Sequence, residues 1–243
     1  MRYIAKEAAN SLVKEASLLL AASATYDENP RVRDIIRLLY GGCCAFCGSS
    51  VEEGSFYQIE HFYPKGNKAY KQYDKDLKNL HYSCTRCNFR KGSVLRDKIF
   101  SPNFFLDKYG NWQVTLPQKI EQEIYYVGHM VYSLDRKASS TDRGRETIKL
   151  FNLNNDDPSG KAHRGYLVER RLRHYDEVYR QVLALYNLLE FYHPSIDIAV
   201  SLLLENLIGY LREDRPWSSM ILNNFGDDIL KLTHYYAANK KRL

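Results

Sequence analysis

Apolar residues at helical spacing open the chain. From Tyr3 to about Ala24 they recur at three- and four-residue steps with charged residues between them, which is typical of an amphipathic helix. A second helix is expected to begin after Asn29, because asparagine is a good N-cap and Pro30 suits the first helical position. Gly41 follows the apolar stretch of this helix and predicts its end.

The middle of the chain has a different pattern. The stretch SFYQIEHFY has the β-branched and aromatic content of a strand. A short helix is expected within CTRCNFRKGSVLRD. The stretch FFLDKYGNWQVTL predicts a hairpin whose turn is DKYGN.

Helical spacing returns in the rest of the chain. Helices are expected over residues 118–133, 142–151, 159–192, 196–211 and 227–238, with approximate boundaries. The longest carries an apolar stripe that is expected to face the core, made of Leu172, Tyr175, Tyr179, Val182, Tyr186 and Leu189. The pattern predicts an α+β protein that is predominantly α. It would have an N-terminal helical arm (1–40), a small mixed core (41–100), and a hairpin plus a C-terminal helical region (101–243).

Composition is that of an ordinary globular protein. The 243 residues are 44% hydrophobic, and 35 Lys and Arg against 29 Asp and Glu give a net charge of +6. This modest basic excess suits a polyanionic partner without requiring one. No apolar run reaches the roughly 18 residues of a membrane span, and the short LLLAASA segment lies inside a helical pattern. A cytoplasmic protein without a membrane segment is expected.

The cysteines form two tight clusters. Cys44 and Cys47 make one CxxC knuckle, and Cys84 and Cys87 make the other. In a reducing compartment such pairs favour metal over disulfides, and two knuckles supply the four thiolates of a structural Zn²⁺ site. Their separation exceeds the roughly 15–20 residues of a simple zinc ribbon. Cys43 is left over, because the spacing to Cys47 favours Cys44 as the ligand.

Side chains suited to phosphodiester hydrolysis lie among these knuckles. Such hydrolysis needs a base and a hard metal ion that keeps open positions. His61 is a candidate base, because imidazole has an ordinary pKa of about 6.5. Asn88 and Glu60 offer oxygen ligands of the kind that Mg²⁺ or Mn²⁺ accepts. The amide of Asn79 could tie a loop together and hold the strand that carries His61.

Each of these residues also has a simpler explanation. His61 could be a partly buried histidine bonded to a carbonyl, and Asn79 and Asn88 could be turn or cap residues. Glu60 could be an ordinary exposed carboxylate. His81 is expected to be a surface histidine rather than a substrate-binding one. The position of His61 between the knuckles favours catalysis.

The stretches IEHFYPKG, NLHYSC and CNFRKG together resemble the HNH nucleases of the ββα-metal fold. The resemblance implies that His61 is the general base, Asn79 the middle structural asparagine and Asn88 a metal ligand. Glu60 stands where many members have aspartate, which leaves open whether it touches the catalytic ion. Lys91 resembles the family's basic residue and is expected to contact phosphate, since it lies on the same helix face as Asn88.

The resemblance also implies a reaction. Asn88, in place of the histidine that some members carry, favours Mg²⁺ or Mn²⁺ over a catalytic Zn²⁺. Double-stranded DNA is the expected substrate. His61 would deprotonate the attacking water, and the zinc ion at the four cysteines would be structural.

A weaker resemblance extends beyond the core. The stretches MRYIAK, DRGRETIKLFNLNND and HRGYLVERR are similar to PtuB-type HNH proteins, which are encoded beside an ATPase in Septu-type and retron-associated anti-phage systems. This implies a PtuA-like ATPase partner and a role in phage defence. Two alternatives are a non-catalytic zinc module that binds nucleic acid or protein, and a stand-alone restriction-type endonuclease.

Overall fold

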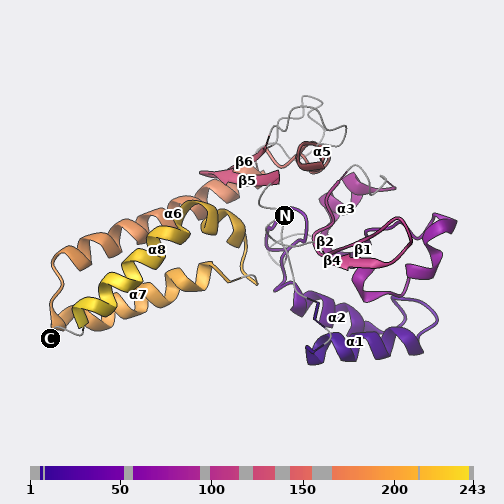
Figure 1. Cartoon of the computed structure of the whole chain (residues 1–243), viewed down its shortest axis with the longest axis horizontal. Helices are drawn as coiled ribbons and strands as arrows, with labels where there is room; N and C mark the ends of the chain where they lie inside the picture. Colours follow the sequence, from indigo (N-terminus) through magenta and orange to yellow (C-terminus); the bar gives the residue numbers. More distant parts are fainter. Residues whose placement is uncertain are drawn as a thin grey trace.

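The fold is α+β and predominantly α, as the pattern predicts. The computed structural model describes residues 6–7, 9–51, 57–93, 99–114, 123–134, 143–154, 166–212 and 214–240. Within these ranges the strands form three separate two-stranded antiparallel sheets, and helices make up most of the rest (Figure 1). None of the helices in the described ranges is long and apolar enough to cross a membrane.

The N-terminal arm is a pair of helices, α1 (Ser11–Ala22) and α2 (Pro30–Leu39). Helix α1 is shorter than expected and begins after Asn10, whose side chain caps it. Helix α2 begins as predicted, because the side chain of Asn29 accepts a hydrogen bond from the backbone N–H of Arg31. Buried apolar residues of α2 face β2. The arm is therefore packed on the mixed core.

The mixed core is a strand pair followed by a helix. Strands β1 (Tyr57–His61) and β2 (Leu80–Cys84) pair antiparallel, with Glu60 opposite His81. Helix α3 (Thr85–Lys91) follows at once and contacts both strands. The connection between the strands contains two short 3-10 helices, η1 (Lys68–Tyr73) and η2 (Leu77–Asn79). The predicted strand and short helix are confirmed.

The predicted hairpin beyond α3 is also confirmed. Strands β3 (Phe104–Leu106) and β4 (Trp112–Val114) pair across a turn held by Asp107, whose Oδ1 accepts backbone N–H groups of Tyr109 and Asn111 at 2.8 and 2.9 Å. The indole Nε1 of Trp112 donates to Asp76 Oδ2 at 2.6 Å. This bond holds the hairpin on the segment that connects β1 and β2.

The helix expected over residues 118–133 is wrong. Residues 118–122 lie outside the described ranges, and the remainder includes a hairpin of β5 (Ile124–Val127) and β6 (Met130–Ser133). Its strands are rich in β-branched and aromatic residues, which favour extended backbone. Gly128 in the turn has φ +56°, a conformation that other residues rarely adopt. Gly128 is the local signal that favours a turn over a continuous helix here.

Asparagines of the last helix, α8 (Ser218–Lys240), hold this hairpin in place. Asn224 Oδ1 accepts the N–H of Gly128 at 2.8 Å, and its Nδ2 donates to the carbonyls of Gly128 and Met220 at 3.0 and 2.8 Å. Asn223 Oδ1 accepts the N–H of Tyr126 at 3.0 Å. These bonds satisfy backbone groups along one side of the hairpin.

Replacing Asn224 by alanine is expected to lower the free energy of unfolding by about 1–3 kcal/mol, because backbone groups of the hairpin lose their partners. Urea unfolding measures the change. Asn206→Ala is the matched control, since this exposed side chain donates to the side chain of Gln181 rather than to the backbone of the hairpin. Equal losses in the two variants would contradict the role given to Asn224.

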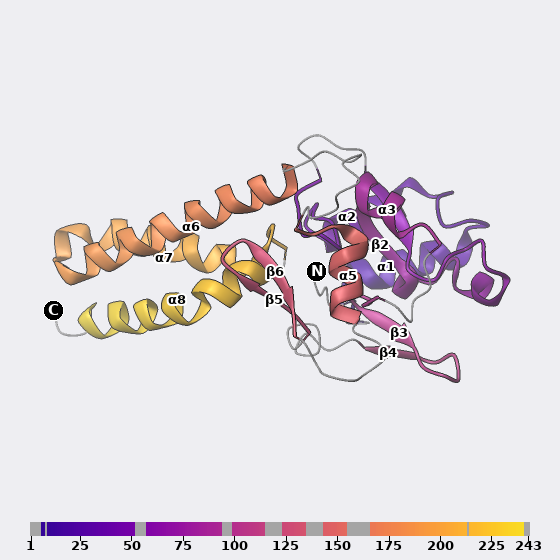
Figure 2. The ribbon, with the colours of Figure 1, turned by 90° about the horizontal axis from the view of Figure 1, so that it is seen from above.

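The C-terminal region is a bundle of three long helices. They are α6 (Tyr166–Glu190), α7 (Asp197–Tyr210) and α8, with a short 3-10 helix, η4 (Pro194–Ile196), before α7. Figures 1 and 2 show the bundle extending away from the mixed core. Helix α5 (Arg143–Phe151) and the β5–β6 hairpin lie between them, in contact with α3 and α8 respectively. The predicted helices of this region are confirmed, although α8 begins earlier than expected, and residues 159–165 lie outside the described ranges.

The stripe predicted on α6 is only partly right. Val182 and Leu189 are buried, but Tyr179 and Tyr186 are 45% and 43% exposed. The buried side chains of α6 are instead Leu167, Arg171, Val178, Val182, Leu185 and Leu189. The predicted stripe shares only Val182 and Leu189 with this set, so the buried face is rotated around the helix axis from the predicted one.

Candidate functional site

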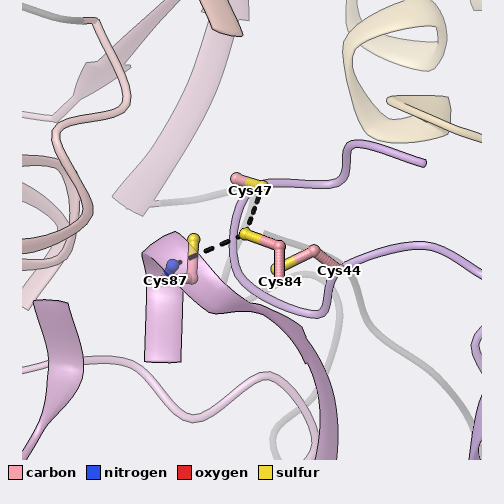
Figure 3. A group of neighbouring side chains, drawn as sticks. All are labelled: Cys44, Cys47, Cys84 and Cys87. Atoms are coloured by element: carbon pink, nitrogen blue, oxygen red, sulfur yellow. Dashed lines mark hydrogen bonds between the residues drawn. The ribbon is translucent and has the colours of Figure 1, made fainter. Parts of the chain in front are cut away.

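The four knuckle cysteines form one buried cluster. The sulfur atoms of Cys44, Cys47, Cys84 and Cys87 all lie within 4.8 Å of one another, and in Figure 3 the four side chains converge from the two knuckles. Gly48, at φ +73°, closes the first knuckle, with its N–H donating to the carbonyl of Cys44 at 2.9 Å. Cys84 ends β2 and Cys87 lies in α3. Such a cluster could hold a metal ion such as zinc.

The chemistry of the cluster fits a cation. Neighbouring sulfurs of Cys44 and Cys47 raise the pKa of the Cys87 thiol well above its ordinary value. Four crowded and buried thiols cannot all ionise unless a positive charge lies among them. A divalent ion supplies that charge, and zinc prefers four sulfur ligands in a tetrahedron. Cys43 is outside the cluster, and its Sγ lies 3.4 Å from the carbonyl oxygen of Gly41.

Trp217 of the C-terminal region is hydrogen-bonded to the first knuckle, a contact that the sequence did not indicate. The indole Nε1 of Trp217 donates to the carbonyl of Cys47 at 3.0 Å, and its backbone N–H donates to the carbonyl of Gly48 at 3.2 Å. Gly41 has φ +55°, and a side chain there would collide with the backbone of Asp214. A contact across so much of the chain leaves no local signal in the sequence.

His61 stands at the end of β1 with its imidazole oriented by the backbone. Its Nε2 lies 2.9 Å from the carbonyl oxygen of Asp74. A carbonyl only accepts, so Nε2 carries the proton and Nδ1 keeps its lone pair. Burial lowers the pKa of His61 below its ordinary value of 6.5. The ring is therefore neutral near pH 7 and can accept a proton at Nδ1.

Asn79 ties the connection between the strands together. Its side chain is fully buried. Oδ1 accepts the N–H of Tyr63 at 2.8 Å, and Nδ2 donates to the carbonyls of Tyr63 and Tyr73, both at 3.1 Å. Tyr73 is adjacent to Asp74, whose carbonyl orients His61. Asn79 thus fixes the backbone on both sides of the imidazole.

Lys91 does not lie where a phosphate-binding residue would. Its side chain has no exposed surface, and Nζ pairs with Glu60 Oε1 at 2.6 Å and donates to the carbonyl of His61 at 2.9 Å. The expectation that Lys91 contacts phosphate is therefore wrong, because the ammonium group is buried and bonded to Glu60 and to the backbone of β1. It is the counter-ion of Glu60, whose pKa is raised by burial and lowered by Lys91. Glu60 itself is largely buried rather than an ordinary exposed carboxylate.

His61, Glu60 and Asn88 line one open pocket of about 1010 Å³. Asn88, half-buried on α3, donates from Nδ2 to Gln58 Oε1. Its Oδ1 is then left to accept or to bind a cation. The predicted base and both predicted oxygen ligands therefore share a single cavity, while Asn79 and Lys91 lie behind its wall.

Part of the pocket wall comes from the N-terminal arm. The arm contributes Tyr26, Asp27 and Arg33 to the lining. The rings of Tyr26 and His61 pack edge to face, with their centres 4.5 Å apart. Lys65 and Lys68 line the pocket from the segment after β1. The sequence analysis missed these residues. The two lysines could have been noticed in PKGNK, directly after His61, but nothing local points to the arm.

His81 is buried, so the expectation of a surface histidine is wrong. Its side chain is enclosed by the rings of Tyr40, Phe46 and Phe62, and Nδ1 lies 2.7 Å from the hydroxyl of Tyr40. His81 on β2 is paired with Glu60 on β1, so the two side chains lie on the same face of the strand pair. Burial lowers its pKa well below 6.5.

Acid is therefore expected to destabilise the protein through His81. The unfolded chain binds a proton near pH 6.5 whereas the folded chain does not, so stability present above that pH is lost as the pH falls toward the folded pKa. The loss approaches about 1.4 kcal/mol per pH unit. Urea unfolding at about pH 7.5 and about pH 5.5, on either side of the ordinary histidine pKa, should show a smaller loss in His81→Phe than in wild type. Identical losses in wild type and His81→Phe would show that His81 does not cause the acid sensitivity.

No protein-family model matches this sequence, and no curated protein matches it either. Its chemistry is inferred from the two sites themselves. One is the buried four-cysteine cluster, and the other is the pocket that holds His61, Glu60 and Asn88.

Proposed function

We propose that this protein is a metal-dependent HNH endonuclease that hydrolyses phosphodiester bonds of DNA. The observation that carries the proposal is the state of His61, with Nε2–H bonded to the Asp74 carbonyl and Nδ1 left to act as a base. Asn88 and Glu60 line the same pocket. The sequence resemblance to the ββα-metal nucleases and the strand pair followed by α3 support the same assignment.

The oxygen atoms of Asn88 and Glu60 would hold Mg²⁺ or Mn²⁺, which prefer such ligands. When bound, the ion neutralises charge that develops on the phosphate. His61 Nδ1 takes a proton from the attacking water, and the Asp74 carbonyl keeps the imidazole in the required tautomer. Lys91 offsets the charge of Glu60, which lowers the negative charge that an incoming phosphate meets.

Zinc would act through geometry alone. Cys87 and Asn88 are neighbours on α3, and Cys84 ends β2 opposite Tyr57 of β1. An ion at the four cysteines would therefore pin the start of α3 to the strand pair. This would fix the position of Asn88 relative to His61.

We further propose that the protein is the nuclease effector of an ATPase-coupled anti-phage system. The PtuB-type stretches in the sequence support this role. The C-terminal bundle carries exposed large apolar residues suited to a protein partner, among them Tyr179, Ile198, Leu202 and Leu230. Co-expression with an ATPase encoded beside it tests the proposal, which fails if the two proteins do not co-purify.

The nuclease proposal is tested by incubating the zinc-loaded protein with supercoiled plasmid. Nicked or linear DNA is expected with Mg²⁺ or Mn²⁺ and none when these ions are omitted, both with and without the ATPase. Absence of cleavage under every one of these conditions would overturn the proposal. A non-catalytic zinc module would then be favoured if the protein still bound DNA.

A further inference from the structure

Three exposed cations surround the mouth of the His61 pocket. Arg33 comes from α2, Lys65 from the segment after β1, and Lys68 from the start of η1. All three line the cavity that His61 lines. They come from two segments of the chain that only the fold brings together.

The positive charge of this rim is not neutralised. Within the described ranges, none of Arg33, Lys65 and Lys68 forms an ion pair with a carboxylate. Among the described residues that line the pocket, the carboxylates are Asp27 and Glu60, and Lys91 already pairs with Glu60. The cavity is therefore net positive and attracts anions.

Aromatic rings hold two of these cations against the pocket wall. Lys65 Nζ lies 5.1 Å from the centre of the Tyr26 ring, and Arg33 Cζ lies 5.3 Å from that of Tyr57. A cation–π contact orients a side chain and leaves its charge available to a ligand. Tyr26 also touches His61, so the ring that holds Lys65 is part of the same site.

We propose that Arg33, Lys65 and Lys68 bind the backbone phosphates that flank the scissile bond of a nucleic acid strand. Three separate cations around one cavity match a repeating polyanion better than a single phosphate group. The inference rests on the proposed function. It replaces the buried Lys91 with exposed residues as the phosphate ligands, and through Arg33 it makes the N-terminal arm part of the substrate site.

The test is the salt dependence of DNA binding. Binding of a short fluorescein-labelled duplex to the zinc-loaded protein is followed by anisotropy over a series of KCl concentrations in buffer without Mg²⁺ or Mn²⁺, so that no cleavage is needed. Each of Arg33→Gln, Lys65→Gln and Lys68→Gln should weaken binding and reduce the slope of log K against log salt by about 0.9, the value for one lost phosphate contact on duplex DNA.

Lys108→Gln is the matched control. Lys108 is also exposed and lies 4.8 Å from a tyrosine ring, that of Tyr109, but it is in the β3–β4 turn and outside the pocket lining. Its slope should stay at the wild-type value. Equal slope changes in Lys108→Gln and the pocket variants would overturn the inference, as would unchanged slopes in the pocket variants or no measurable binding by wild type.

Binding and cleavage separate the two proposals. Reduced slopes in a protein that never cuts plasmid would support the phosphate rim and reject the nuclease. Plasmid cleavage together with unchanged slopes would support the nuclease and reject the rim. A thermal melt of each variant checks that the fold is retained.

Discussion

Replacing His61 by alanine is expected to lower the rate of metal-dependent plasmid cleavage by about 10²–10⁴-fold, the usual contribution of a positioned general base. The variant loses the Nδ1 lone pair that remains available because Nε2–H is bonded to the Asp74 carbonyl. It keeps the buried four-cysteine cluster, which does not contain His61. Cleavage is measured as the initial rate of nicking at saturating Mg²⁺ or Mn²⁺.

Two controls make this result specific. His234→Ala removes an exposed histidine of α8, outside the pocket lining, and should cut at the wild-type rate. Because His61 lines an open cavity, added imidazole should partly restore cutting by His61→Ala. A folded, zinc-loaded His61→Ala protein that cuts as fast as wild type would remove His61 from the mechanism.

Replacing Cys84 by serine is expected to remove the structural metal ion and to destabilise the mixed core. Cys84 joins β2 to α3, and its sulfur lies 4.0 Å from that of Cys47. Structural zinc sites bind with about 10–16 kcal/mol, and that free energy is available to folding. We therefore expect a loss of several kcal/mol in unfolding free energy, together with loss of cleavage through misplacement of Asn88.

Metal content by mass spectrometry and thermal unfolding measure these effects. Cys43→Ser is the matched control, because Cys43 is also buried and directly precedes Cys44 of the cluster, but lies outside the cluster itself. It should retain about one zinc ion per chain. Full zinc content and unchanged stability in Cys84→Ser would contradict the assignment of the cluster.

Fluorescence of Trp217 offers a second measure of the same event. Its indole donates to the Cys47 carbonyl, so removal of zinc by a chelator should disturb its buried environment. A Trp112→Phe background leaves Trp217 as the single tryptophan of the chain. An emission spectrum unaffected by zinc removal would show that the contact of Trp217 with the first knuckle does not depend on the metal.

Local signals in the sequence determined α2 of the N-terminal arm and β1 and α3 of the mixed core. The N-cap at Asn29, the strand that ends at His61 and the helix that begins after Cys84 lie as predicted. In each case a cap, a turn or a knuckle acts within a few residues. The two CxxC spacings also sufficed to select the four clustered cysteines.

Signals that depend on packing were ambiguous. The stretch that contains β5 and β6 carries apolar residues compatible with helix or strand, and its contacts with α8 are made far along the chain. On α6 two stripes compete, and contacts with α7 and α8 bury the one that contains Leu167, Val178 and Leu185. Neighbouring elements decide such cases, because local propensity differs too little between the alternatives.

The sequence by itself therefore determined α2, β1 and α3, the four clustered cysteines and the candidate base. Only the tertiary structure decided which charges face the pocket. It buried Lys91 beneath β1 and brought Arg33 of α2 to the pocket that holds His61. The physical reason is that burial of a charge depends on what packs over it, and the groups that cover Lys91 or flank Arg33 come from distant parts of the chain.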